Sequence, residues 1–314
     1  MLVRWLSLLL VPALAVAQPP VPSLDRVILA MGTELKVRLG GQGNLAGASE
    51  AALSEAARIE KACSTWDPAS SWSRLNAAGS NPVALDREWL VLLDQMKTWQ
   101  VRTEGAFDPA LMPLLRAWGI RQGGRTPDQA ALSKARKASG AGLLELNLAA
   151  GTARLKDPDS GVEEGGFLKG YALDRMRQAA GTTEGLLDFG GQLLAWGRPV
   201  EVSVADPQDR QLPRISFTLN NASLASSGTS ERGHHILDPR TGEPCSAWGS
   251  TAVVAADALT ADVLSTALFV MGPDAGLAWA ERHGFAAAFL FNDGGVRLTH
   301  AFHNLHPSVR KEQP

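Results

Sequence analysis

The sequence predicts an α+β fold in a single folded unit. Apolar residues recur at helical spacing in some segments and alternate with polar residues in others, so both helices and strands are expected. The two kinds of segment do not alternate strictly as strand, helix, strand, which favours mixed or antiparallel sheets packed against helices over a parallel α/β sheet. Hydrophobic residues are 45% of the 314 residues and charged residues 20%, a composition typical of a chain that folds around a sizeable core.

The N-terminal segment is expected to lie outside that unit. Arg4 precedes an apolar run, residues 5–17, that ends in the small-residue pattern Ala15-Val16-Ala17. The run is too short to span a bilayer comfortably and has the order of a secretory signal peptide. We therefore expect cleavage after Ala17 and export to the periplasm, without a lipid anchor because no cysteine stands at the cut. The expected parts are a signal peptide at 1–17, a leader at 18–25, a catalytic domain at 26–300 and a tail at 301–314.

The first half of the domain begins with strands and continues with helices. Residues 26–39 alternate in two stretches around Gly32, which predicts two strands joined there. Residues 45–63 and 87–101 carry apolar side chains at helical spacing. Thr126-Pro127-Asp128 combines a cap, a Pro in the first turn and an acid at the positive helix end, so it predicts another helix start. Two polar segments are expected to be loops with one short helix each: 64–79 and 105–119.

The second half is richer in strands. Helices are expected at residues 167–180, 260–271 and 273–282, each from its helical spacing of apolar side chains. Residues 226–244 form a long polar segment that predicts a loop. The expected strands are 143–148 with 152–155 as a hairpin, then 186–196, 201–205, 214–219 and 250–255, and a final hairpin of 285–291 with 296–299.

Charge and cysteine content narrow the function classes. The formal net charge is −2, so a generic binder of nucleic-acid backbones is not expected. Two cysteines are too few for a disulfide scaffold or a four-cysteine zinc site. Export would allow Cys63 and Cys245 to pair, and two unpaired core cysteines are an equal alternative.

A glycine-rich segment near the N-terminus offers a dinucleotide-binding interpretation that its context does not support. Gly41-Gln42-Gly43-Asn44-Leu45-Ala46 matches the GxGxxA pattern between a strand and a helix. A buried parallel strand should follow that helix, whereas the sequence continues with a polar loop at residues 64–68. A surface turn is therefore the better interpretation.

Two segments suggest an anion site and a cation site, each with a purely structural alternative. Gly165 and Gly166 stand at a helix start with Lys169 one turn inside, and free N–H groups beside a cation favour an anion. The alternative is a solvated lysine after an acidic first turn. Asp262 and Thr266 are four residues apart on a strongly apolar helix, so their oxygens face one way and suit a hard cation. The alternative is that Thr260 caps this helix and Asp262 complements its dipole.

A histidine beside an Asp-Pro turn is the candidate proton acceptor. His235 precedes Asp238-Pro239-Arg240-Thr241-Gly242, and the ordinary pKa of histidine suits a general base. The alternative is a structural turn with a solvent-facing imidazole.

Eight short segments, taken in order, resemble the FAD:protein FMN transferase family, also called the ApbE family. They are Met31-Gly32-Thr33, Ser64-Thr65-Trp66 with Ser73-Arg74-Leu75-Asn76, Ala106-Phe107-Asp108-Pro109, Gly165-Gly166 with Lys169-Gly170-Tyr171-Ala172-Leu173-Asp174, Gly190-Gly191, Ser227-Gly228, His235-Ile236-Leu237-Asp238-Pro239-Arg240-Thr241-Gly242, and Ala261-Asp262 with Ser265-Thr266. Each segment is a weak signal alone. The ordered set covers roughly residues 31–272 and favours the functional interpretations of Lys169, Asp262 and His235.

The resemblance implies a single ApbE-like catalytic domain and a reaction. A Thr or Ser hydroxyl of a target protein would attack the FMN-side phosphorus of FAD, the FMN would become attached through a phosphoester, and AMP would leave. Positioning and charge neutralisation dominate catalysis of this kind. The implied cofactors are Mg²⁺ and FAD, the latter as the FMN donor. The implied partner is a target flavoprotein subunit with a Thr or Ser flavinylation site, expected in a membrane redox complex, and nucleic acid is not expected.

The resemblance also assigns roles to residues of this chain. Asp262 and Thr266, with Ser265 beside them and the backbone of Gly166, would bind the metal, so Asp262 is also a catalytic candidate. His235 is the candidate base. The FAD site would be formed by Met31, Trp66, Ala106, Phe107, Asp108, Glu163, Lys169 and Ile236, whose aromatic and apolar members suit an isoalloxazine or an adenine.

Three departures from the family pattern and two rival functions accompany this assignment. Glu163 stands where the family often has Asp, and Trp66 stands where a Tyr is common, so stacking is kept and the phenol hydroxyl is lost. The segment between Gly228 and His235 is short compared with many members. The rival functions are FAD pyrophosphate hydrolysis to FMN and AMP, and a non-enzymatic exported flavin carrier.

Overall fold

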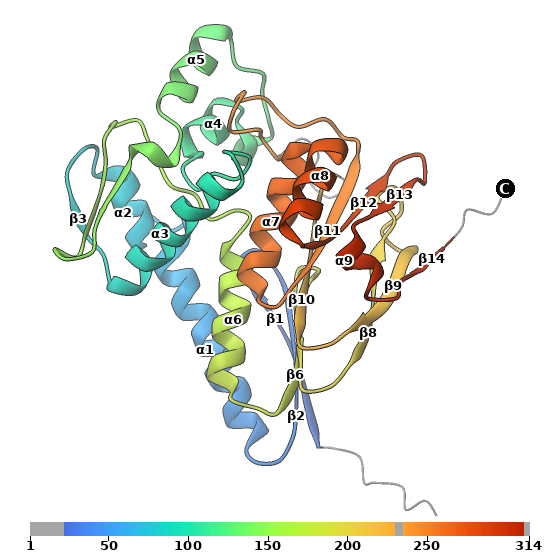
Figure 1. Cartoon of the computed structure of the whole chain (residues 1–314). Coiled ribbons are helices and arrows are strands. Elements are labelled where there is room, and N and C mark those ends of the chain that lie inside the picture. The colour runs from blue at the N-terminus through green and yellow to red at the C-terminus, as the bar shows by residue number, and fades with distance from the viewer. Residues whose placement is uncertain (1–21, 230–234, 311–314) are drawn as a thin grey trace, which may run out of the picture.

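A computed structural model describes residues 22–229 and 235–310 (Figure 1). The predicted signal peptide lies outside the described residues. An eight-stranded sheet forms the centre, and every strand pair in the described residues is antiparallel. Across the sheet the order is β1 (Ser23–Ala30), β2 (Thr33–Gly40), β6 (Glu184–Phe189), β7 (Gln192–Trp196), β10 (Ala222–Gly228), β11 (Gly249–Ala255), β12 (Ala286–Phe291) and β13 (Val296–Leu298). The α+β prediction is confirmed.

Four helices cover one face of this sheet: α1 (Leu45–Cys63), α6 (Leu168–Ala180), α7 (Ala258–Met271) and α8 (Pro273–His283). The strands turn alternate residues toward them, as β2 does with its buried Leu35, Val37 and Leu39. Helix α7 packs against α6, α8 and strands β10 and β11, which is why it is apolar nearly all round. A polar side chain on α7 is therefore unusual and needs a partner.

A second, smaller core lies on the other face of the sheet. It joins β11 and β12 to a three-stranded sheet of β14 (Ser308–Val309), β9 (Pro213–Leu219) and β8 (Val200–Ala205). Helix α9 (His300–His303) adds Phe302, whose ring meets Phe217 at 5.2 Å between centroids. In β11 and β12, alternate residues serve the two cores, so these strands are covered on both sides.

The remaining elements extend the helical side of the molecule (Figure 1). They are α2 (Ser71–Ala77), β3 (Val83–Ala84), α3 (Arg87–Arg102), α4 (Met112–Ala117), the 3₁₀ turn η1 (Ile120–Gln122), α5 (Gln129–Lys137), the 3₁₀ turn η2 (Ala141–Leu143), β4 (Leu144–Asn147) and β5 (Thr152–Leu155). Strands β3, β5 and β4 form a third sheet. Helix α5 starts where the Thr-Pro-Asp segment predicted a helix start, but its cap is Asp128 rather than Thr126: the Asp128 side chain accepts the Ala131 N–H at 2.8 Å.

Two sequence predictions of strands need correction. The strand expected at 186–196 is a hairpin of β6 and β7, because Gly190 and Gly191 both have positive φ (60° and 88°) and form its two-residue turn. Strand β10 extends to Gly228, into the loop expected from residue 226. Its buried Ser223 is accommodated because the hydroxyl donates to the Leu193 carbonyl at 2.6 Å, and Ser226 is exposed.

The ends of the folded part also differ from the expected bounds. Strand β1 begins at Ser23, inside the expected leader, because its whole length pairs with β2. Part of the expected tail is ordered, since Ser308 and Val309 pair with β9 as β14. Within the two described stretches, no helix is long and apolar enough to cross a membrane. Cys63 and Cys245 are buried free thiols, so of the two alternatives the unpaired one is observed.

Candidate functional site

The candidate metal residues come from two helices that are distant in sequence and adjacent in space. Helix α7 carries Asp262 and Thr266 one turn apart, and the turn before α6 carries Gly166. Gly166 has a φ of 77°, and a Cβ built there would stand 2.9 Å from the Thr266 hydroxyl oxygen. The backbone of Gly166 and the side chain of Thr266 therefore line one small space, which a side chain at residue 166 would fill.

Asp262 is a buried carboxylate with incomplete compensation. It is 6% exposed, and its Oδ2 accepts the Gly170 N–H at 2.9 Å. Burial raises the pKa of this carboxyl, while the charge of Lys169 and the Gly170 hydrogen bond oppose that rise. Among the described residues its Oδ1 has no hydrogen-bond partner. A bound cation at this oxygen would compensate the buried negative charge.

The donor set fits a hard divalent ion that keeps several waters. It offers one carboxylate, one hydroxyl and a backbone segment, all oxygen donors of the kind Mg²⁺ prefers. No group of three or more His, Cys, Asp or Glu side chains could hold a metal anywhere in residues 22–229 and 235–310, so a soft or fully caged site is not found there.

Ser265 is placed differently from Thr266. Its buried hydroxyl donates to the Asp262 carbonyl at 3.0 Å and lies 2.8 Å from the Ser227 hydroxyl of β10. Ser227 also lies 3.3 Å from the Thr266 hydroxyl. Ser265 therefore ties α7 to the sheet, and Thr266 is the hydroxyl with the half-buried position beside Gly166.

The loop that leads into α6 carries Glu163 and is fixed from two sides. The Glu163 N–H donates to the Pro109 carbonyl at 2.9 Å, and Asn76 exchanges two hydrogen bonds of 2.8 Å with the backbone of Val162. The Glu163 Oε2 accepts the Gly165 N–H at 2.8 Å. Burial and the charge of Glu164 raise the pKa of Glu163 to about 7, against the opposing effects of the Gly165 N–H and Arg121.

The Ala106-Phe107-Asp108 segment is buried and serves to hold its own loop. Ala106 and Phe107 are 1% and 2% exposed, and the Phe107 ring packs edge-on against Phe167 at 5.9 Å. Both oxygens of Asp108 are used, one by the Ala110 N–H at 2.8 Å and one by the Ala141 N–H at 3.0 Å. The expected contribution of Asp108 to a nucleotide pocket would therefore be indirect, through the loop that meets Glu163.

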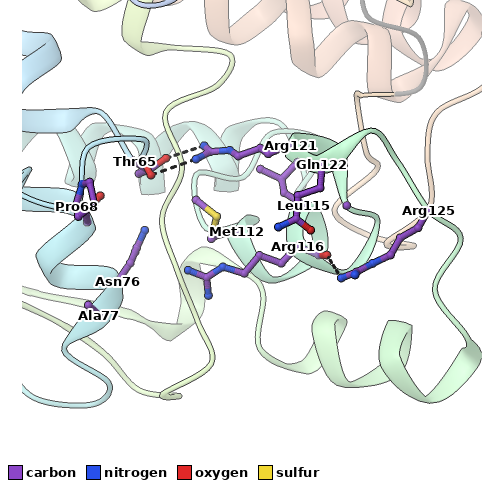
Figure 2. A pocket seen from close by; sticks show the side chains of 12 residues that line it. Thr65, Pro68, Asn76, Ala77, Met112, Leu115, Arg116, Arg121, Gln122 and Arg125 are labelled. Carbon is purple, nitrogen blue, oxygen red and sulfur yellow. Dashed lines mark hydrogen bonds between the residues drawn. The ribbon is translucent and has the colours of Figure 1, made fainter.

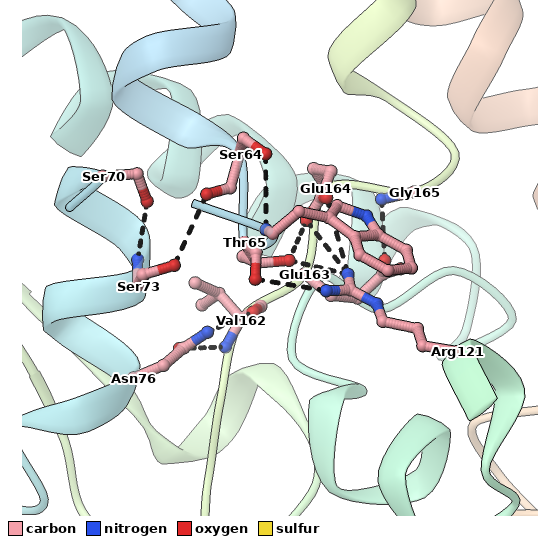
Figure 3. Close-up of polar contacts among 11 residues, drawn as sticks. Ser64, Thr65, Ser70, Ser73, Asn76, Arg121, Val162, Glu163, Glu164 and Gly165 are labelled. Carbon is pink, nitrogen blue, oxygen red and sulfur yellow. Dashed lines mark hydrogen bonds and ion pairs between the residues drawn. The ribbon is translucent and has the colours of Figure 1, made fainter. Parts of the chain in front are cut away.

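A polar cluster beside Trp66 was not predicted from the sequence. Arg121 of η1 donates to the Thr65 carbonyl at 3.2 Å and to the Thr65 hydroxyl at 2.6 Å, and the Thr65 hydroxyl donates to Glu164 (Figure 3). The Arg121 guanidinium also stands 4.3 Å from the centre of the Trp66 ring, which is 66% exposed. Residues 120–122, between Gly119 and Gly123, carry no sequence pattern that predicts this cluster. The partners of Arg121 are more than 40 residues away in sequence.

A cavity adjoins this cluster, and its lining contains none of the predicted site residues. It has a volume of about 460 Å³ and lies between α2, α4 and η1 (Figure 2). Three arginines line it, Arg116, Arg121 and Arg125, and the lining contains no acidic side chain. It meets the candidate site at Thr65 and Arg121, and also at Asn76, which binds the backbone of Val162 next to Glu163.

Two further segments of the predicted site are the turn at Met31 and the turn that follows His235. Met31 has a φ of 45° in the turn between β1 and β2, and its N–H donates to Glu60 of α1 at 3.0 Å. His235 and Ile236 are half-buried, and the Ile236 carbonyl accepts the Cys245 N–H at 2.9 Å. The Asp238 carboxylate accepts three hydrogen bonds from Arg240, one from the backbone N–H and two from the guanidinium. Arg240 also donates to the Val270 carbonyl at 3.3 Å, which attaches this turn to α7.

The ApbE family model matches residues 31–290, which is most of the chain. The chain belongs to the ApbE family. Similar curated proteins are the FAD:protein FMN transferases of Treponema pallidum, 30% identical with 88% of this chain and 86% of the relative covered, and of Klebsiella pneumoniae, 31% identical with 71% and 75% covered. The ApbE protein of Thermotoga maritima has a solved structure with a TM-score of 0.85 and 28% identity, covering 90% of this chain and 99% of that one. The apo form of the Pseudomonas stutzeri flavinyl transferase ApbE gives 0.80 and 28%, covering 92% and 98%.

This membership confirms the predicted resemblance and the expectation of an enzyme. It also agrees with the architecture, because the solved ApbE structures cover nearly the whole described part of the chain. The roles of individual residues stay predictions that rest on the geometry given above.

Proposed function

We propose that this ApbE family member transfers FMN from FAD to a Thr or Ser hydroxyl of a target protein and releases AMP. The observation that carries the proposal is the meeting of the turn before α6 with α7. It brings Gly166 beside Thr266 and Gly170 onto Asp262, although these pairs are about 100 and 92 residues apart. The relatives in Treponema pallidum and Klebsiella pneumoniae are named FAD:protein FMN transferases, which supports the same reaction class.

Lys169 and the helix start supply the charge that a pyrophosphate needs. Lys169 lies in the first turn of α6, close enough to Asp262 for its charge to oppose the rise in the pKa of that carboxyl that burial causes. The N-terminal N–H groups of a helix favour an anion, and the lysine adds a full positive charge. Mg²⁺ bound by Asp262 and Thr266, with the Gly166 backbone, would neutralise charge that develops on the leaving phosphate.

The transfer step requires a hydroxyl to lose its proton as it attacks. The new P–O bond forms between the target oxygen and the FMN-side phosphorus, and the bond to the bridging pyrophosphate oxygen breaks, so that AMP leaves with that oxygen. His235 is the proposed acceptor of the hydroxyl proton, since the ordinary pKa of an imidazole lies near neutral pH. The turn that follows His235 is attached through Arg240 to the Val270 carbonyl of α7, the helix that also carries Asp262.

The site of action is proposed from the N-terminal sequence. The run at residues 5–17 and its Ala15-Val16-Ala17 end indicate export to the periplasm. A target there would be a flavoprotein subunit with a Thr or Ser acceptor, such as one of a membrane redox complex. FAD and Mg²⁺ would be needed in the same compartment.

The test is transfer of flavin to protein in a purified system. The chain is incubated with FAD, Mg²⁺ and a target carrying a flavinylation site, and covalent flavin is read as fluorescence on a denaturing gel together with AMP release. Asp262→Asn should lower the transfer rate by about 100-fold or more, because it removes the only carboxylate of the donor set. Asp257→Asn is the matched control, since Asp257 is exposed on the same helix start and Asn also caps helices well, so the rate should change less than about twofold.

The outcomes separate the rival functions. Stoichiometric AMP and covalent FMN support the transferase. AMP and free FMN without any acceptor would favour the hydrolase, and tight FAD binding without turnover would favour the carrier. Full activity of Asp262→Asn, or unchanged activity in excess EDTA, would contradict the metal assignment.

A further inference from the structure

Trp66 presents one face of its indole to solvent and the other to a charged side chain. Its side chain is among the most exposed large apolar groups of the described residues, at 66%. The Arg121 guanidinium covers the second face at 4.3 Å from the ring centre. An aromatic ring held in this way is an open platform on one side only.

Arg121 is itself held in place from three directions. Its Nη1 donates to the Thr65 carbonyl, its Nη2 donates to the Thr65 hydroxyl, and Nη2 lies 3.4 Å from Glu164 Oε2. The Arg121 side chain is 22% exposed and Glu164 is 17% exposed, so water screens this pair less than it screens a surface ion pair. A planar guanidinium with five donors can serve all these partners while it stacks on a ring, which an ammonium cannot do.

This arrangement joins two loops of the candidate site. Thr65 precedes Trp66 on the loop after α1, and Glu164 lies between Glu163 and Gly165 on the loop before α6 (Figure 3). The Thr65 hydroxyl donates to Glu164, so Arg121, Thr65 and Glu164 form a closed set of contacts. The orientation of Trp66 relative to Glu163 and Gly166 therefore depends on a residue of η1 that belongs to neither loop.

We propose that Arg121 is a positioning residue for FAD: it fixes the Trp66 indole so that its open face stacks on a planar ring of the nucleotide. The proposal rests on the proposed function, because it takes FAD as the ligand. Without Arg121, the exposed indole would have to be ordered when FAD binds, and ordering such a side chain weakens binding.

A double-variant cycle on FAD affinity tests this role. The full chain and the variants Arg121→Gln, Trp66→Ala and their combination are titrated with FAD by calorimetry in the presence of Mg²⁺. Arg121→Gln should raise the Kd for FAD about five- to tenfold, because FAD binding must then also order the Trp66 side chain. In the Trp66→Ala background the same substitution should change the Kd less than about twofold, since Arg121 then has no ring to position.

Arg102 offers a matched control. Its guanidinium stands 4.1 Å from the Trp99 ring centre, so Arg102→Gln removes the same kind of contact away from the candidate site. This variant should leave the FAD Kd within about twofold. Arg121→Lys keeps the charge and loses the planar stacking, and it should behave like Arg121→Gln. If the melting curve of Arg121→Gln shows that this variant does not fold, the Kd of Arg121→Lys tests the positioning role instead.

The results distinguish this proposal from the one on which it rests. An unchanged Kd in Arg121→Gln, or an equal loss with and without Trp66, would overturn the positioning role while FAD binding by the unaltered chain still stood. A failure of the unaltered chain to bind FAD at all would instead overturn the proposed function. A loss in Arg102→Gln equal to that in Arg121→Gln would show a general effect on folding and would also overturn the positioning role.

Discussion

At the residue scale, Glu163 is the group whose environment most changes its chemistry near neutral pH. Its loop is half-buried, and burial together with the adjacent charge of Glu164 raises its pKa to about 7 from an ordinary value of 4.5. The folded state therefore holds this proton more tightly than the unfolded chain does. Stability falls as the pH rises from about 4.5, where the unfolded chain begins to lose the proton, to about 7, and above 7 the penalty is complete.

Glu163→Gln should remove that penalty. We expect the variant to be more stable than the unaltered chain at pH 8.5, by at most about 3 kcal/mol, and the gain to shrink steadily between pH 7 and pH 4.5. The free energy of unfolding is measured in urea at pH 8.5 and pH 5 without ligand. An equal gain at both pH values would contradict the raised pKa and point to a packing effect.

At the element scale, the start of α7 depends on a carboxylate from another helix. Asp174 of α6 accepts the Ala258 N–H at 2.8 Å and the Leu259 N–H at 2.9 Å, and Asp257 accepts the Thr260 N–H at 2.7 Å. In return, Asp262 of α7 accepts the Gly170 N–H of α6. A side chain at Gly170 would bring a Cβ within 2.8 Å of the Asp262 Cβ, so the close crossing of the two helices also requires glycine there.

Asp174→Ala should therefore cost far more stability than Asp257→Ala. The first leaves the Ala258 and Leu259 N–H groups without their carboxylate, and we expect a loss of about 3 kcal/mol. The second removes an exposed cap and should cost about 1 kcal/mol. Urea unfolding at pH 7.5 measures both, and Asp174→Asn, which keeps one acceptor oxygen, should fall between them. Equal losses for the two Ala variants would show that α7 is held by packing alone.

At the scale of the whole molecule, the sequence predicted the elements better than their contacts. The bounds of α1, α7 and α8 follow from apolar spacing and caps, and the expected helix at 45–63 is observed over those residues. The hairpin of β6 and β7 was missed because a two-glycine turn interrupts an otherwise continuous apolar stretch. The apolar pattern is that of a strand on both sides of the turn. A two-residue turn therefore reverses the chain direction without a change in this pattern.

Local patterns were also of limited use for predicting the candidate site. The spacing of Asp262 and Thr266 carries a local signal for a cation site, whereas the metal role of Gly166 was implied only by the family resemblance. No local pattern pointed to Arg121, and the loop-holding hydrogen bonds of Asp108 could not be predicted either. The partners come from distant segments: Thr65 and Glu164 for Arg121, and Ala141 for Asp108. Ordered motifs find the family, and only the tertiary contacts tell a loop-holding carboxylate from one that faces a ligand.

The two buried thiols provide a test of whether the chain unfolds as one unit. Cys63 ends α1 and Cys245 follows the His235 turn, yet both belong to the same main core, which also includes Ala30 and Phe289. Burial raises the pKa of both thiols, that of Cys245 to about 12, so neither should react with a thiol reagent at pH 7.5 in the folded state.

The variants Cys63→Ser and Cys245→Ser each keep one thiol as a reporter. We expect the thiol of each variant to be labelled in urea at the same urea concentrations at which that variant loses its helical circular dichroism. A core that unfolds as one unit requires this agreement, because both thiols lie in the same cluster of buried side chains. Labelling of one thiol well before its helix signal falls would reveal two units that unfold separately.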